Sequence, residues 1–171
     1  MGNSIWTVED VGPKVERCLK PLLTTAGLAL DFKVAPGSII DPNFEKPDVT
    51  VIFDGRDLDL LLANKGELLL ALEHVTLEAL RARPEEHSRL LFDANDYRML
   101  RVEELRLSAE TAADKVKRTG MPFRFNPMNS RERRIIHLAL RADAAVKTES
   151  EGLAPRRHVV VYPANHQPAK K

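Results

Sequence analysis

The stretch that decides the fold of the C-terminal half covers residues 126–137 and reads NPMNSRERRIIH. Its first four residues have the composition of a turn. Asn129, with Glu132 three residues later, has the spacing of a capping box, in which each side chain bonds to the backbone of the other residue. The stretch therefore predicts a helix that begins after Asn129 and runs to about Ala142.

Two side chains of this helix have the chemistry of a phosphate site. Arg133 and His137 are four residues apart, so a helix places them on one face, one turn apart. A guanidinium fork matches the oxygens of a phosphate, and an imidazole beside it donates to the same phosphate or stacks on a base. Spacing alone leaves the alternative open that this is an ordinary solvated helix face.

Short strands are expected around the helix. Residues 121–125, 146–148 and 158–162 have strand composition, and residues 149–155 are expected to form a loop between the last two strands. Basic residues at the end of that loop, Arg156 and Arg157, are predicted to contact its glutamates and to lie beside the helix. The aromatic residues of these segments are assigned to the core: Phe123, Phe125 and Tyr162.

The N-terminal half has a different order of elements. Apolar residues recur at helical spacing from Val11 to about Gly27, and the period then changes to the alternation of a strand at residues 28–34. A second strand is predicted at residues 49–53, a short helix at 57–62, a longer helix ending before Pro84, and a third strand at 90–92. A long helix at residues 95–120 follows, with an apolar face of Met99, Val102, Leu105, Ala109, Ala112 and Val116.

A second candidate site is the joint between the two helices of that half. Residues 63–66 read ANKG, and a joint of this kind presents backbone N–H groups at the positive end of the second helix. Ala63, Asn64, Lys65 and Gly66 are therefore candidate contacts to a phosphate backbone. The acidic residues that flank the joint repel such a ligand, so a plain helical hairpin without a ligand is the alternative.

Composition limits the classes of function. The chain has 43% apolar and 30% charged residues, and no apolar run is long enough to span a membrane. A single cysteine excludes an internal disulfide. Residues 121–171 hold ten Lys and Arg against four acids, a net charge of +6, whereas the first 120 residues have a net charge of −5. A polyanionic partner is therefore expected to bind the C-terminal third.

These motifs, taken together, resemble those of the Jag (KhpB) family. The run at residues 126–137, the sequence TESEG at 148–152 and the sequence RHVVV at 157–161 are similar to the C-terminal half of its members. The sequence DGRD at 54–57, the residues up to Gly66-Glu67 and the sequence DYR at 96–98 resemble its KH half. The resemblance covers roughly residues 10–163.

The resemblance implies an α+β fold and a function. A type II KH-like α-β-β-α-α-β domain (residues 1–95) is followed by a small α/β domain named R-three-H for its Arg, three spacer residues and His (96–163), and by a flexible basic tail (164–171). It implies a cytoplasmic, bacterial, non-catalytic protein that binds single-stranded RNA or DNA without metal or cofactor. A small KH-only protein partner and a role in control of cell envelope growth and division are also implied.

The chain departs from the family pattern at two points. Ala63 stands where the first glycine of the KH joint is expected, and the N-terminal extension common in the family is not present in the sequence. The predicted nucleic-acid contacts in the C-terminal domain are Asn129, Arg131, Arg133, Arg134, His137, Arg156 and Arg157.

Two other classes of function remain open from the sequence. Glu149 and Glu151 near His137 suggest a metal-dependent nuclease or nucleotide hydrolase, although no P-loop or paired His motif is present. A protein-interaction adaptor whose KH half has lost nucleic acid is the other class, because Ala63 and the acidic first 120 residues favour it.

Overall fold

The computed structural model describes residues 5–38 and 46–166, and the chain divides into two compact units, residues 1–99 and 100–171. The final five residues of the predicted tail lie outside the described residues. Nothing in the helices of the described part has the length and apolar character needed to cross a bilayer.

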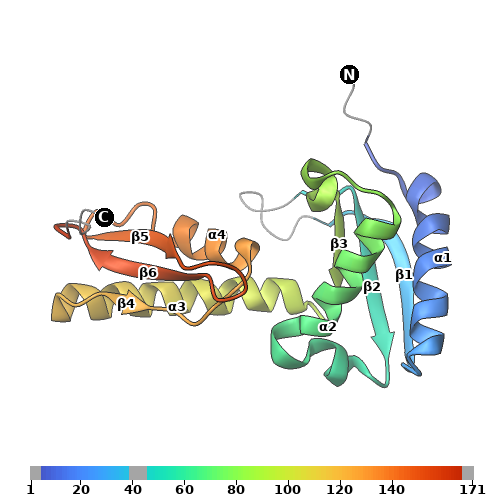
Figure 1. Ribbon diagram of the computed structural model, residues 1–171, viewed down its shortest axis with the longest axis horizontal. Helices are drawn as coiled ribbons and strands as arrows, with labels where there is room; N and C mark the ends of the chain where they lie inside the picture. The colour runs from blue at the N-terminus through green and yellow to red at the C-terminus, as the bar shows by residue number, and fades with distance from the viewer. Residues whose placement is uncertain (1–4, 39–45, 167–171) are drawn as a thin grey trace. The chain divides into compact units, whose positions relative to one another are not determined.

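The first unit has the predicted order of helix, strand, strand, helix, helix, strand (Figure 1). Non-helical backbone at residues 63–66 divides α2 into the short and the long helix that the sequence predicts, so this prediction is confirmed. A turn of 3-10 helix, η1, precedes the last strand. The elements are α1 (Val8–Thr25), β1 (Leu30–Pro36), β2 (Val49–Gly55), α2 (Leu58–Ala79), η1 (Pro84–Arg89) and β3 (Leu90–Asp93).

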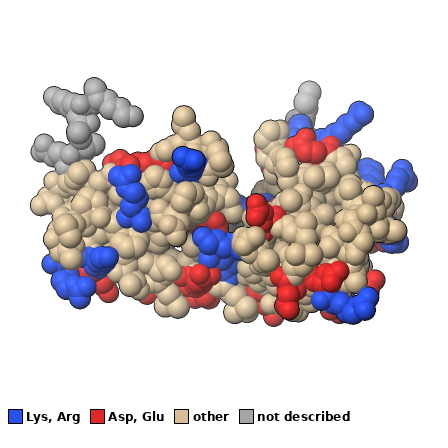
Figure 2. All heavy atoms as spheres, turned by 60° about the horizontal axis from the view of Figure 1, so that its bottom comes forward, with Lys and Arg blue, Asp and Glu red and all other residues tan. Residues whose placement is uncertain are grey.

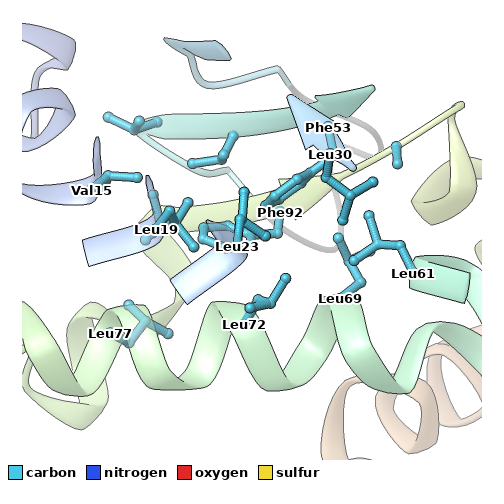
Figure 3. Close-up of a cluster of buried hydrophobic side chains, with 14 of the residues drawn as sticks. Val15, Leu19, Leu23, Leu30, Phe53, Leu61, Leu69, Leu72, Leu77 and Phe92 are labelled. Carbon is cyan, nitrogen blue, oxygen red and sulfur yellow. The ribbon is translucent and has the colours of Figure 1, made fainter. Parts of the chain in front are cut away.

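One sheet and two helices enclose the core of the first unit. The strand order is β1-β2-β3, with β1 antiparallel and β3 parallel to β2. Helices α1 and α2 direct leucines onto Phe53 and Phe92 of the sheet, whose ring centroids are 5.3 Å apart (Figure 3). The buried leucines include Leu19, Leu23, Leu69, Leu72 and Leu77.

The second unit is a three-stranded antiparallel sheet packed with two helices. Its strand order is β4-β6-β5, so the last strand of the chain lies in the centre. Four of the predicted apolar residues of α3 are at most 4% exposed and Val102 is 7% exposed, but Met99 is 47% exposed and was wrongly assigned to this face. The elements are α3 (Tyr97–Thr119), β4 (Phe123–Arg124), α4 (Ser130–Ala139), β5 (Val146–Glu151) and β6 (His158–Pro163).

Two predicted boundaries in the second unit are wrong. Residues 149–151 belong to β5 rather than to a loop, because Glu149 pairs with Val160 and Glu151 pairs with His158 in the sheet. Polar residues on both faces of β5 hide the alternation that usually marks a strand. Helix α4 ends at Ala139, three residues early, where N–H groups begin to bond at the shorter i−3 spacing.

The start of the predicted flexible tail is held in place. The Ala164 N–H donates to the Ala145 carbonyl at 2.9 Å, and the ring of His166 stacks on Tyr162 with centroids 4.1 Å apart. Residues 164–166 therefore belong to the packed part of the second unit.

Candidate nucleic-acid interface

The beginning of α4 is fixed by the predicted capping box, which the structure confirms. Asn129 Oδ1 accepts from the Glu132 N–H at 2.9 Å, and Glu132 Oε2 accepts from the Asn129 N–H at 3.2 Å. The other oxygen of Glu132 accepts from Arg101 of α3 at 2.8 and 2.7 Å. Glu132 is 7% exposed, so this nearly buried carboxylate fastens the start of α4 to α3.

Arg133 and His137 meet at one hydroxyl group of the neighbouring strand. Arg133 Nη1 donates to Ser150 Oγ at 3.2 Å, and His137 Nε2 lies 2.9 Å from the same oxygen. His137 Nδ1 lies 2.7 Å from Thr148 Oγ1. Thr148 and Ser150 are two residues apart on β5, so both point toward α4. The two predicted residues thus form one network with two hydroxyls that the sequence did not single out.

The network gives His137 an internal role. Burial and the neighbouring charge of Arg133 lower the pKa of His137 below its ordinary value, so the ring is neutral near pH 7. Both ring nitrogens are engaged by hydroxyls of the same unit. The imidazole was predicted to donate directly to a phosphate, but neither of its ring nitrogens is free to do so in this structure. His137 instead orients Ser150 and, through it, Arg133.

Arg133 retains unused hydrogen-bonding capacity. Its side chain is partly exposed, and its Nε is buried without a hydrogen-bond partner among the residues the structure describes. A guanidinium has five N–H donors, and one of them is occupied by Ser150. Nε is out of reach of an arriving anion because it is buried, so the remaining donors of the terminal nitrogens are the ones that can contact one.

Three further predicted cations have no carboxylate partner among the described residues. Arg134, Arg156 and Arg157 are exposed, and no carboxylate of the described chain lies within ion-pair distance of them or of Arg133. Three of the four acids in residues 121–171 are paired elsewhere: Glu132 with Arg101, Asp143 with Lys117, and Glu151 with Arg124. Figure 2 shows Lys and Arg side chains standing on the surface of the second unit, at the left of the view.

The predicted Arg–Glu contacts in the loop before β6 are wrong. Glu151 accepts instead from the Tyr162 hydroxyl and lies 3.6 Å from Arg124. Both contacts arise because Glu151 is part of β5, which places its side chain over the sheet. Arg156 and Arg157 are left without an acidic partner in the described chain.

The segments that carry these cations, the start of α4 and residues 156–157, meet at one end of the second unit. The Met128 N–H donates to the Arg157 carbonyl at 3.1 Å, so Arg157 lies beside the turn that leads into α4. Asn129 and Arg131 belong to the cap and first turn of α4, and Arg131 is partly exposed. The positive end of a helix dipole favours anions at this position. We call this surface, made of the first turn of α4 with Arg133, Arg134, Arg156 and Arg157, the basic end of α4.

The backbone of the helix joint in the first unit, residues 63–66, accepts alanine at position 63, where the KH motif has a glycine. Its φ is −56°, so this position does not require glycine. Asn64, Lys65 and Gly66 have φ of 51°, 64° and 69°, three successive left-handed residues. Gly66 is buried, and a Cβ there would lie 2.8 Å from the Tyr97 ring. Gly66 therefore has a structural role, while Ala63, Asn64 and Lys65 are exposed for contact.

Comparison with known proteins agrees with this geometry. A family model described as the R-three-H domain matches residues 103–163. The chain is 31% identical over 153 residues to the RNA-binding protein KhpB of Clostridium symbiosum, and the match covers 90% of this chain and 66% of that protein. It is 35% identical over 130 residues to the protein of the same name from Bacillus subtilis, a match that covers 75% and 62% of the two chains.

The second unit is thus an R-three-H domain, with Arg133 and His137 as the residues that give the domain its name. The chain spans just under two thirds of the two relatives described above and 38% of the KhpB protein of Lactiplantibacillus plantarum. It belongs to the Jag/KhpB family, as the sequence motifs predict.

Proposed function

We propose that this chain is a non-catalytic protein that binds single-stranded RNA, and that the basic end of α4 binds the phosphates. The observation that carries the proposal is the set of four arginines without acidic partners around the ordered Arg133–Ser150–His137 network. Uncompensated cations beside a helix N-terminus are the usual electrostatic signature of a phosphate-backbone site. The relatives named RNA-binding protein KhpB support the same function.

The salt dependence of binding tests the electrostatic part of the proposal. Fluorescence anisotropy of a labelled single-stranded RNA, measured between about 50 and 200 mM salt, should give a log–log slope near −3 if about four phosphates are neutralised. Arg133→Ala with Arg134→Ala should reduce the magnitude of that slope by roughly 1.4, since each contact contributes about 0.7.

A matched control removes the same kind of charge from the other end of α4. Arg141 is exposed and follows the last turn of the helix, about 15 Å from its first turn. Arg141→Ala should leave the slope within error of the wild type. A flat salt response of the wild type, or an equal effect of Arg141→Ala, would contradict a phosphate site at the basic end of α4.

A non-catalytic role is part of the proposal. Within the described residues, no group of three His, Cys, Asp or Glu is placed to hold a metal ion, and His137 is engaged by hydroxyls. Incubation of labelled RNA with the protein and magnesium should leave the RNA intact. The partner protein, the cytoplasmic location and the envelope role implied by the family resemblance stay predictions.

A further inference from the structure

An open groove in the second unit lies outside the basic end of α4. It lies between α3 and the chain at residues 123–126, which includes β4, and has a volume of about 550 Å³. This is within the range of roughly 300–1,000 Å³ that small-molecule sites have. Leu107, Thr111 and Lys115 line one wall, and Phe123, Phe125 and Asn126 line the other.

Two aromatic rings form the apolar part of the groove. Phe123 and Phe125 are two residues apart on the edge of the sheet, and their centroids are 5.1 Å apart at an interplanar angle of 77°. Both side chains are only partly buried, so their assignment to the core from the sequence is wrong. The Phe125 N–H donates to the Val159 carbonyl at 2.9 Å, which holds the backbone of this wall in place.

The charges around the groove suit a ligand with a negative backbone. Lys115 Nζ lies 5.3 Å from the centroid of Phe123, and no carboxylate of the described chain forms an ion pair with it. The one acid in the wall, Glu104, is already paired with Arg101 at 2.7 Å. Because Lys115 is exposed, its side chain can leave the ring face for a phosphate while a base takes that face.

Polar groups for the edge of a base are also present. Asn126 lines the groove and is exposed, and its side-chain amide makes no hydrogen bond within the described chain. An amide offers both a donor and an acceptor, which is what the edge of a nucleobase requires.

The groove and the basic end of α4 are close together along the chain. The chain passes from Phe125 to Asn129, the cap of α4, and even a fully extended path between their Cα atoms is at most about 14 Å. A strand of a few nucleotides therefore reaches both surfaces.

We propose that this groove binds an unpaired base of the single-stranded RNA by stacking on Phe123 and Phe125. The inference rests on the proposed function and adds a base subsite to its phosphate site. Stacking on one aromatic platform changes affinity by about five- to a hundredfold.

The test uses the full chain and RNA oligonucleotides that carry the fluorescent base aminopurine at successive single positions. Stacking quenches this fluorophore, so at saturating protein one position should be quenched by the wild type. Phe123→Leu, which keeps the side chain apolar and of similar size, should lose the quenching and bind about tenfold more weakly. Arg133→Ala should weaken binding yet keep the quenching once the protein is saturating.

A second variant keeps the test decisive if Phe123→Leu does not fold. Phe123→Trp in a Trp6→Phe background places the only indole of the chain in the groove, and RNA should quench its emission without loss of affinity. RNA bound by the wild type without quenching at any position, or quenching that survives Phe123→Leu, would overturn the base subsite and leave the proposed function intact. Absence of RNA binding by the wild type would overturn the proposed function itself.

Discussion

His137 shows at the residue scale why a motif spacing is not yet a mechanism. The four-residue interval correctly places Arg133 and His137 on one face of a helix. Their shared partner, Ser150, could not be predicted, because it comes from a strand whose polar residues on both faces conceal its register. The imidazole therefore serves to order the arginine, a role that spacing alone does not reveal.

The neutral ring of His137 makes the stability of the second unit depend on pH. Burial and Arg133 lower the pKa of His137 in the folded protein. The contribution of the neutral ring to the free energy of unfolding is therefore complete above the ordinary histidine pKa. It is lost as the pH falls below that value and through the lower folded pKa, because protonation then favours the unfolded chain. Chemical unfolding at about pH 7.5 and about pH 5.5, on either side of the ordinary value, should show this loss in the wild type.

A glutamine variant isolates this contribution. His137→Gln keeps hydrogen-bonding atoms but does not titrate, so its loss of unfolding free energy between the two pH values should be smaller than that of the wild type. Equal losses would show that His137 does not contribute to the pH dependence.

The joint within α2 shows the same limit at the element scale. The sequence correctly predicts two helices with a break at residues 63–66, since Gly66 and the residues before it interrupt the helical pattern. The sequence could not show that φ at Ala63 is −56°, a value that does not require glycine, because backbone angles are not visible in the sequence. The glycine that matters for structure is Gly66, against which the Tyr97 ring packs.

Substitutions at the two ends of the joint should therefore have different effects on the free energy of unfolding. Gly66→Ala introduces a Cβ against Tyr97 at a φ of +69°, and a cost of about 2–4 kcal/mol is expected from strain and overpacking. Ala63→Gly should change the free energy of unfolding by at most about 1 kcal/mol, since φ at Ala63 suits either residue. Thermal or urea unfolding measures both, and similar costs at the two positions would contradict this account of the joint.

At the scale of the whole molecule, charge is divided unevenly along the chain. The net charge of −5 in the first 120 residues and +6 in the remaining 51 is visible in the sequence and predicts phosphate binding by the C-terminal third. The sequence does not show which cations stay unpaired. Arg124, Arg101 and Lys117 form ion pairs with Glu151, Glu132 and Asp143 only in the folded chain.

This division predicts unequal contributions of the two units to RNA affinity. Lys65→Ala, in the exposed joint of the first unit, should weaken binding of single-stranded RNA less than Arg133→Ala does, because the acids flanking Lys65 oppose phosphate binding there. Arg133→Ala is expected to cost about tenfold in affinity, as for a hydrogen bond between charged groups. The same anisotropy titration measures both variants, and a larger loss for Lys65→Ala would assign the main phosphate contacts to the first unit.

The most direct measurement is the affinity of the full chain for single-stranded RNA after Arg133→Ala and His137→Ala are combined, with circular dichroism and thermal unfolding confirming that the variant is folded. The double variant removes the guanidinium and the ring that positions it, so affinity should fall by at least about tenfold at moderate salt. A folded double variant that binds RNA as tightly as the wild type would contradict the assignment of the phosphate site to the basic end of α4.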